Sequence, residues 1–221
     1  MTEVFSIVPV RNFKDTKIRL SSVLSVEERA DLTKALLKRV VTALQNSNVT
    51  EIIIVSPIPA EIELFLQGFR KTRSVQESHR HGGVNSAMSD GVQEIPENER
   101  EKKILLMPSD LPFISSEAIN RTIDLLESYD LIINPSVKRD GTNLLAFSLS
   151  KMIPLHYDDD SYSKHVKEAR ERRMKYLVTD WNEYSFDLDD KEDLNSLMQI
   201  LEANSNENLM KILGESETLR K

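Results

Sequence analysis

Short, fully apolar segments recur along the chain between stretches that have a helical pattern. In the two clearest, residues 52–55 and 104–107, no polar residue interrupts the apolar run. A strand with one face in solvent alternates apolar and polar residues, whereas a strand covered on both faces does not. We therefore expect an α/β fold in which helices cover both faces of a mostly parallel central sheet. The predicted strands are residues 4–9, 51–56, 103–108, 130–134 and 144–148.

The helical pattern is clearest after Ser25. Ser25 and Glu28 have the spacing of a capping box, and a leucine or valine follows at every fourth position from residue 32 to residue 44. This pattern predicts a helix that runs to about residue 46. Further helices are expected from Ser115 or Ser116, over residues 161–173, and after Asp189.

Length and composition limit the classes of protein. The 221 residues suit one large domain, residues 1–201, followed by a tail, residues 202–221, that is either helical or frayed. The absence of cysteine excludes a disulfide scaffold and a zinc site built from thiolates. The formal charge of −7 argues against a nucleic-acid partner, and no apolar run approaches the roughly 20 residues that span a membrane. We expect a cytoplasmic protein.

A cationic loop follows the first predicted strand. It carries four cations, Arg11, Lys14, Lys17 and Arg19, against the single anion Asp15. Because ligands of an open α/β sheet bind beyond the carboxyl ends of its strands, this loop is placed to hold an anion such as a triphosphate. No glycine precedes Gly68, so the loop is neither a Walker loop nor a GxGxxG turn, and side-chain charge must bind the phosphates. The alternative is a solvated basic loop.

An aspartate follows the apolar strand that ends near residue 107. Asp110 lies between Pro108 and Pro112, which limit the freedom of the backbone. A carboxylate at this edge is a candidate ligand for Mg²⁺, which takes one or two protein carboxylates and completes its shell with water and substrate phosphates. The alternative is an aspartate that caps the next helix or closes a turn, although Ser115 and Ser116 are better placed as caps.

An acidic pair precedes the last predicted helix. Asp187 and Asp189 are two residues apart in an extended segment, so both carboxylates lie on one face, with Phe186 and Leu188 on the other. The pair either completes a metal site or caps the helix, and the sequence alone favours capping for one of the two.

Two further segments offer polar side chains to a ligand. Residues 82–91 have glycines that open a helix of small residues, from which Asn85 can contact a base edge, although a loop before a helix has the same pattern. Residues 140–143 are a turn by composition, in which Thr142 and Asn143 bond either a ligand or the turn itself.

Several segments match the pattern of a known family when they are taken in order. They are VPVRNFKDTKIRL, the capped helix from Ser25, GGVNSAMSDG, MPSDLPFIS, DGTNLLAF, YDDDSYSKH and DLDDKEDL. The strongest are the KxRL end of the first loop, the SDLP box and the GTN turn. Together they resemble the archaeal 2-phospho-L-lactate guanylyltransferase family, whose wider relatives are the MobA-like nucleotidyltransferases. The resemblance covers residues 4–201 and implies a Rossmann-like three-layer α/β/α nucleotidyltransferase fold.

The activity that the resemblance implies is an early step in making the deazaflavin coenzyme F-420. GTP and 2-phospho-L-lactate give lactyl-diphospho-guanosine and pyrophosphate, and bacterial relatives use phosphoenolpyruvate in place of phospholactate. The expected partners are GTP and one of these acids, with no nucleic acid and no membrane, and a homodimer is possible. The alternatives are a MobA-like or sugar-phosphate nucleotidyltransferase with another acceptor, and a nucleotide-binding regulatory module without turnover.

The resemblance also implies roles for individual residues. Lys17 and Arg19 hold the triphosphate and neutralise the leaving pyrophosphate, with Arg11 as a helper, and together with Asp110 they form the catalytic set. The nucleotide site is completed by Pro9, Val10, Pro108 and Asn85, of which Asn85 faces the guanine. Magnesium is bound by Asp110, Asp187 and Asp189, and the acceptor is contacted by Thr142 and Ser161. One segment departs from the family, because residues 158–160 are three aspartates where the family usually carries glycine.

Overall fold

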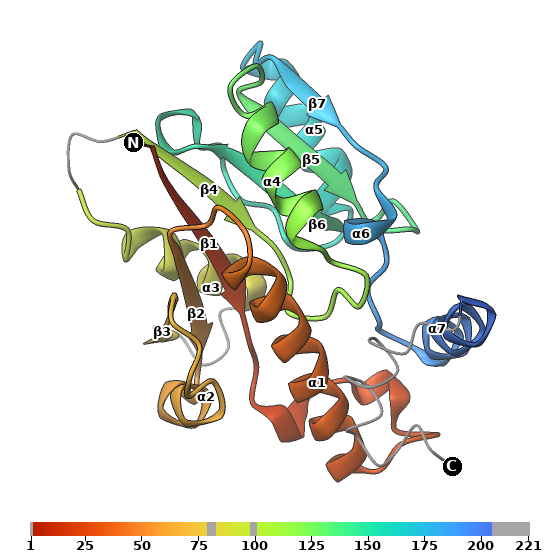
Figure 1. The fold of residues 1–221 in the computed structure, drawn as a ribbon. Coiled ribbons are helices and arrows are strands. Elements are labelled where there is room, and N and C mark those ends of the chain that lie inside the picture. Colours follow the sequence, from red (N-terminus) through yellow and green to blue (C-terminus); the bar gives the residue numbers. More distant parts are fainter. Residues whose placement is uncertain (1, 79–82, 98–100, 205–221) are drawn as a thin grey trace.

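A seven-stranded sheet forms the centre of the molecule (Figure 1). The computed structural model describes residues 2–78, 83–97 and 101–204. The strands are β1 (Glu3–Pro9), β2 (Glu51–Ser56), β3 (Thr72–Gln76), β4 (Lys102–Leu106), β5 (Leu131–Pro135), β6 (Thr142–Ser148) and β7 (Tyr176–Val178). The predicted strands correspond to β1, β2, β4, β5 and β6, with ends that differ by at most two residues.

The strand order across the sheet is β3-β2-β1-β4-β6-β5-β7. β6 pairs antiparallel with β4 and β5, and the other neighbouring pairs are parallel, which confirms the mostly parallel sheet. Leu106, the last residue of β4, pairs with Leu145, and Pro135, the last residue of β5, pairs with Thr142. Because β6 runs against its neighbours, its first residues lie at the edge where the parallel strands end.

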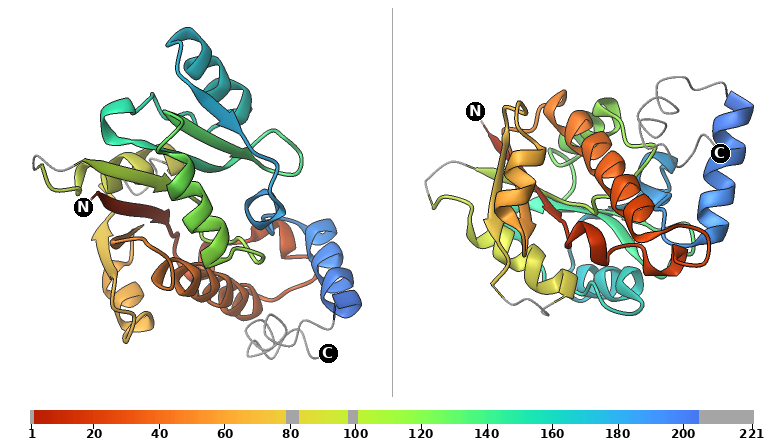
Figure 2. Two further views of the ribbon diagram at one scale, coloured as in Figure 1. Left: turned by 45° about the horizontal axis from the view of Figure 1, so that its top comes forward. Right: turned by 90° about the horizontal axis from the view of Figure 1, so that it is seen from below.

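Helices cover both faces of the sheet and give the expected three layers (Figures 1 and 2). Residues of α1, α2, α4 and α6 pack on one face, and residues of α3 and α5 pack on the other. The helices are α1 (Val26–Gln45), α2 (Pro59–Phe65), α3 (Gly83–Gln93), α4 (Ser116–Leu125), α5 (Ser161–Glu171), α6 (Asn182–Ser185) and α7 (Lys191–Asn204), with short 3-10 helices η1 (Phe13–Asp15), η2 (Ile18–Leu20) and η3 (Leu149–Lys151).

The unbroken apolar run of β2 is explained by these layers. Ile52 and Ile54 belong to the core under α1, whereas Ile53 and Val55 belong to the core under α3. The four side chains are at most 1% exposed. A strand covered on both faces gains from apolar side chains at every position, as the sequence predicted.

One glycine sets how closely α3 approaches the sheet. A Cβ added at Gly91 would lie 2.3 Å from Cγ2 of Ile7 and 3.0 Å from Cγ2 of Val55. Real Cβ atoms do not come this close to a neighbour, so α3 reaches β1 and β2 only because residue 91 has no side chain.

A third, smaller core joins the end of the described chain to α1. It consists of Leu20, Leu32, Leu36, Leu188, Leu197 and Leu201. The last helix, α7, runs to Asn204 and so passes the expected boundary between domain and tail at residue 201. Residues 205–221 of the expected tail lie outside the described residues.

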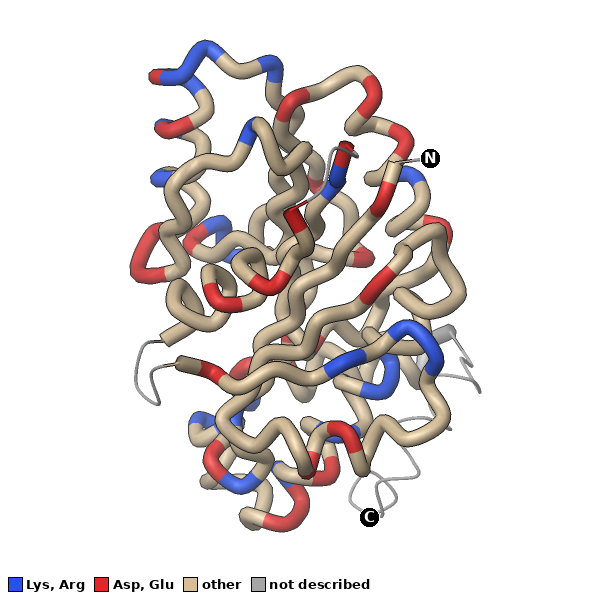
Figure 3. The backbone as a smooth tube through the Cα atoms, turned by 90° about the vertical axis from the view of Figure 1, so that its left-hand side faces the viewer, with Lys and Arg blue, Asp and Glu red and all other residues tan. Residues whose placement is uncertain are grey.

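Some elements escape the sequence patterns. β3 is half-buried and carries arginine, threonine and glutamine, and β7 has only three residues, so neither shows a clear apolar run. Both are the outermost strands of the sheet. Charged residues of both signs are spread over the periphery, while the middle strands carry few (Figure 3). None of the described helices is long and apolar enough to cross a membrane.

Candidate active site

The loop after β1 is held against α1 and β2. The Val10 amide donates to the Val55 carbonyl at 2.8 Å, and the ring of buried Phe13 packs edge-on against Phe65. The guanidinium of buried Arg29 donates to the Thr16 carbonyl at 3.2 Å. These contacts fix the loop from Val10 to Thr16, so the position of the next residue, Lys17, is set by the fold.

Lys17 is the loop cation that the fold brings to the acids. Its backbone adopts the left-handed conformation (φ 51°, ψ 40°), which is uncommon outside glycine. Its ammonium, on a side chain only 8% exposed, donates to Asp110 Oδ2 and, at 3.1 Å, to Asp189 Oδ1. Burial by itself lowers the pKa of Lys17, but the two carboxylates outweigh burial and raise the pKa above its usual value. Lys17 is therefore a buried, fully charged cation.

Three carboxylates from two distant segments form a cluster here, and two of them, Asp110 and Asp189, contact the ammonium. Asp110 follows β4, and Asp187 and Asp189 lie between α6 and α7. Burial, reinforced by the charges of Asp110 and Asp189, raises the pKa of Asp187 to about 7, while the neighbouring Asn143 side chain acts in the opposite direction. The buried Oδ1 of Asp110 has no hydrogen-bond partner. The cluster therefore holds more negative charge than Lys17 neutralises.

Neither member of the acidic pair caps α7. Asp190 accepts from the Asp193 amide, and Asp193 accepts from the amides of Asp189 and Asp190, all at 3.0 Å. The expectation that Asp187 or Asp189 caps this helix is wrong, because the next acid in the run has the better position. Likewise Ser115, which accepts from the Ala118 amide, caps α4 and leaves Asp110 free of that role. Residues 186–189 belong to no helix or strand, but they keep the expected alternation, since Phe186 and Leu188 pack in the third core.

These residues fit a divalent cation in charge and chemistry. Carboxylate oxygens are the ligands that Mg²⁺ prefers, and the unpartnered Asp110 Oδ1 is a buried oxygen that lacks a cation or a donor. Among the described residues, however, no three acidic or histidine side chains are already arranged around a common metal position. The Lys17 ammonium bridges Asp110 and Asp189 instead, so a metal site here requires this ion pair to rearrange.

The other predicted cations lie outside the cluster. Arg11 and Arg19 are exposed, and their side chains make no hydrogen bond or ion pair within the described part of the chain. Ile18, beside Arg19, is 67% exposed. Both arginines are therefore free to bind an anion, but the fold does not bring them to the acids as it does Lys17.

A second polar cluster lies where β6 starts. Thr142 Oγ1 is 2.9 Å from Nδ1 of His165 and 3.3 Å from the Ser161 hydroxyl, and all three residues are at most 5% exposed. Asn143, the next residue of β6, lies beside Asp187 and so connects this cluster to the first. The two residues predicted to contact an acceptor, Thr142 and Ser161, therefore lie together.

Asn85 is engaged by the protein itself. Its side-chain oxygen, in the first turn of α3, accepts from the Tyr157 amide at 2.6 Å. The other predicted nucleotide residues lie at or just beyond the ends of two strands. Pro9 is the last residue of β1, buried Val10 follows it, and Pro108 lies two residues beyond β4. Contact of these four residues with a nucleotide stays a prediction.

The three aspartates of residues 158–160 face solvent. All three are exposed, and Asp158 forms an ion pair with Lys164 at 2.9 Å. Asp160 precedes α5 in the left-handed conformation (φ 56°) without a side-chain cap bond. A glycine adopts this backbone without strain, which agrees with the glycine expected of the family in this loop.

Sequence patterns missed His165, whereas Asn143 was already a candidate. A lone histidine in a mostly charged helix is not informative. The usable signal was its spacing, since Ser161, His165 and Ala169 recur every fourth residue and are all buried on one face of α5.

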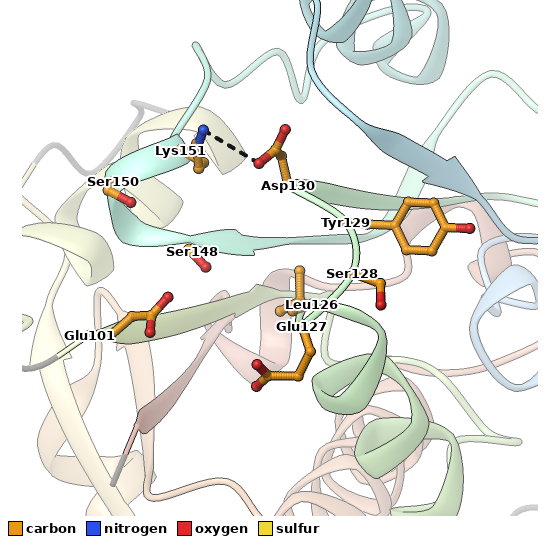
Figure 4. A pocket seen from close by; sticks show the side chains of 9 residues that line it. All are labelled: Glu101, Leu126, Glu127, Ser128, Tyr129, Asp130, Ser148, Ser150 and Lys151. Atoms are coloured by element: carbon orange, nitrogen blue, oxygen red, sulfur yellow. Dashed lines mark ion pairs between the residues drawn. The ribbon is translucent and has the colours of Figure 1, made fainter.

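A separate polar pocket lies at the opposite edge of the sheet, near the start of β5 and the end of β6 (Figure 4). Two of its acids are already used within the protein, because Asp130 pairs with Lys151 at 3.4 Å and Glu127 pairs with buried Lys103. None of the residues predicted to act in binding or catalysis lines it. The candidate site is therefore the edge that carries Lys17.

Known proteins resemble this chain over most of its length. A family model described as guanylyl transferase, CofC-like, matches residues 4–219. A 2-phospho-L-lactate guanylyltransferase of Methanocaldococcus jannaschii is 33% identical over 208 residues, which cover 94% of this chain and 88% of that protein. A phosphoenolpyruvate guanylyltransferase of Rubrobacter xylanophilus is 33% identical over 196 residues, which cover 86% of this chain and 91% of that protein.

The fold has a solved counterpart. A protein of Desulfovibrio desulfuricans, described as a nucleotide-diphospho-sugar transferase, matches with a TM-score of 0.81 over 99% of this chain and 97% of its own, at 22% identity. This likeness confirms the α/β architecture expected from the sequence. Because the family model matches residues 4–219 and relatives are above 30% identical over most of their length, the chain belongs to the family of CofC-like guanylyl transferases.

Proposed function

We propose that this protein transfers the guanylyl group of GTP to a small phosphorylated carboxylic acid, 2-phospho-L-lactate or phosphoenolpyruvate, and releases pyrophosphate. The observation that carries the proposal is the cluster of Lys17 with Asp110, Asp187 and Asp189 at the carboxyl edge of the sheet, at the end of the loop that also carries the exposed Arg11 and Arg19. Relatives with each of the two activities in their names support it. The reaction is an early step in making coenzyme F-420, and we expect the protein to act in the cytoplasm.

In the reaction a phosphate oxygen of the acceptor bonds to the α-phosphorus of GTP, while the bond from that phosphorus to the departing pyrophosphate breaks. The acceptor phosphate is largely a dianion at neutral pH, so it needs no general base. Catalysis then depends on alignment of the two substrates and on neutralisation of the charge that grows on the leaving group. Lys17 and Arg19 supply positive charge to the triphosphate, with Arg11 beside them.

The three carboxylates of the cluster are proposed to bind a metal ion. Asp110, Asp187 and Asp189 would hold a divalent cation, Mg²⁺ in our proposal, which neutralises phosphate charge when it is bound. The Lys17 ammonium, held in this structure by Asp110 and Asp189, then turns to a substrate phosphate. Asn85 is proposed to face the guanine, and Thr142 and Ser161 the acceptor.

The test is a matrix of pyrophosphate-release assays. Each of the four nucleoside triphosphates is offered with phospholactate, phosphoenolpyruvate or no acceptor. We expect release from GTP with at least one of the two acids and little without an acceptor. Release that needs CTP, or an acceptor of another class such as a sugar phosphate, would favour the nucleotidyltransferase alternative, and no release under any condition would favour a binding module.

A matched pair of variants links the activity to the cluster. Lys17→Ala should raise the KM for GTP and lower kcat, because it removes the buried cation. Lys14→Ala removes an exposed cation of the same loop and should change neither. Equal effects of the two substitutions would show that only the net charge of the loop matters.

A further inference from the structure

His165 is enclosed by polar and aromatic neighbours at the base of the second polar cluster. It lies in α5 and is 0% exposed, with the ring of Tyr157 edge-on at 5.2 Å between centroids. Each ring nitrogen has one partner: Nε2 faces the His156 amide at 3.0 Å, and Nδ1 faces the Thr142 hydroxyl at 2.9 Å. The imidazole is thus held at both nitrogens.

These two partners define the tautomer. A backbone amide can only donate, so Nε2 must be the unprotonated nitrogen that accepts from His156. A neutral imidazole carries its single proton on the other nitrogen. Nδ1 therefore donates to Thr142 Oγ1.

This hydrogen bond is one of two that occupy both acceptor positions of the Thr142 hydroxyl oxygen. A hydroxyl oxygen accepts two hydrogen bonds and donates one. Thr142 Oγ1 accepts from His165 Nδ1 and from the Ser161 hydroxyl at 3.3 Å. Its own hydrogen has no acceptor within the described part of the chain, so the only hydrogen bond that Thr142 still has to offer is a donation.

The acceptor substrate of the proposed reaction needs a hydrogen-bond donor from the protein. Phospholactate and phosphoenolpyruvate at neutral pH present phosphate and carboxylate oxygens, which accept hydrogen bonds and donate almost none. With the opposite tautomer, Nδ1 would take the Thr142 hydrogen and leave an oxygen lone pair facing an anion. We propose that His165 is a positioning residue that fixes Thr142 as a hydrogen-bond donor to the anionic acceptor. This inference rests on the proposed function and assigns one part of its specificity.

Two substitutions separate the two hydrogen bonds of the ring. His165→Asn keeps an N–H group near the position of Nδ1 and loses the partner of the His156 amide. His165→Gln places its amide near the position of Nε2 and loses the donor to Thr142. We expect the glutamine variant to raise the KM for the acceptor about tenfold or more, and the KM for GTP to change little, because a lost hydrogen bond to a charged group has an effect of this size. The asparagine variant should keep an acceptor KM near that of the wild type.

Threonine variants complete the cycle. Thr142→Val should raise the acceptor KM at least as much as His165→Gln, and the double variant should add little to Thr142→Val alone, because both substitutions remove the same donation. The proposal is overturned if the acceptor KM values of the variants follow their thermal stability and if His165→Asn and His165→Gln have the same acceptor KM. His165 would then have a structural role.

Nitrogen-15 NMR of the imidazole in the wild-type protein tests the tautomer without any activity. Protonated Nδ1 and unprotonated Nε2 are expected at pH 7.5, and the reverse assignment overturns the proposal even if a variant fails to fold. A wild-type protein that turns over neither acid defeats the proposed function. An active wild type with an unchanged acceptor KM in His165→Gln defeats only this inference.

Discussion

Acidification should destabilise the fold through His165. Burial lowers the pKa of His165 from 6.5 to about 4, with nearby His156 acting in the same direction and Asp158 and Glu168 in the opposite one. Between pH 6.5 and pH 4 the unfolded chain therefore binds more protons at this residue than the folded protein does. The contribution of His165 to the free energy of unfolding is complete above pH 6.5 and is lost as the pH falls toward 4.

The magnitude follows from the two pKa values. Each pH unit between them is worth about 1.4 kcal/mol. The free energy of unfolding should therefore lose about 2 kcal/mol at pH 5 and about 3 kcal/mol at pH 4 through this one group. Asp187 acts in the opposite direction over much of the same range, because a folded-state pKa of about 7 makes the folded protein bind that proton first. The wild-type curve alone does not isolate His165.

The difference in the free energy of unfolding between the wild type and a variant that cannot titrate at residue 165 isolates the contribution of His165. Urea unfolding of the wild type and of His165→Gln, which cannot titrate at this position, is measured from pH 7.5 to pH 5. We expect the stability advantage of the wild type to shrink by about 2 kcal/mol over this range. Ser163→Ala, an exposed and non-titrating change on the same helix, should show a constant difference. A wild-type advantage over His165→Gln that stays constant within about 0.5 kcal/mol would refute the reasoning.

Four other substitutions test the site and the packing. Asp110→Asn should lower turnover more than about a hundredfold with little loss of stability, because a metal-binding carboxylate stabilises the transition state and contributes little to the core. Near-normal pyrophosphate release by a folded variant would show that Asp110 is not part of the site. Lys17→Met should increase the affinity of the nucleotide-free protein for Mn²⁺ at least about tenfold, because it frees the carboxylates of Asp110 and Asp189. A titration followed by electron paramagnetic resonance measures this affinity, and equal affinities of the variant and the wild type would show that Lys17 does not compete with a metal. Gly91→Ala should cost about 1–3 kcal/mol of stability in urea unfolding, because its methyl group meets Ile7, and an unchanged midpoint contradicts that close approach. Asp160→Gly should raise the free energy of unfolding by up to about 1 kcal/mol, since it relieves a left-handed backbone, and leave the acceptor KM unchanged; a large shift of that KM places the exposed triplet in the acceptor site.

Local patterns in the sequence were enough to predict the layers of the fold. The apolar run of β2, the capping box at Ser25 and the fourfold spacing along α1 act over a few residues, and each produced the element expected. The candidate acids were also readable, because Asp110 directly follows a buried strand. Where a competing local partner exists, such reading fails: capping of α7 went to Asp190 rather than to Asp187 or Asp189.

Which of these side chains meet was decided by the tertiary structure. Lys17 and Asp110 are 93 residues apart, and Lys17 reaches the acids because its left-handed backbone is anchored on α1, while Arg19 from the same loop stays in solvent. The direction of β6 had no signal in its sequence, yet only an antiparallel β6 puts Thr142 and Asn143 at the edge where β4 ends. The tautomer of His165 likewise depends on an amide and a hydroxyl from other segments. Hydrophobic periodicity is a property of neighbours along the chain and is therefore legible in the sequence, whereas strand direction and hydrogen-bond pairing depend on contacts between distant segments, which exist only once the chain has folded.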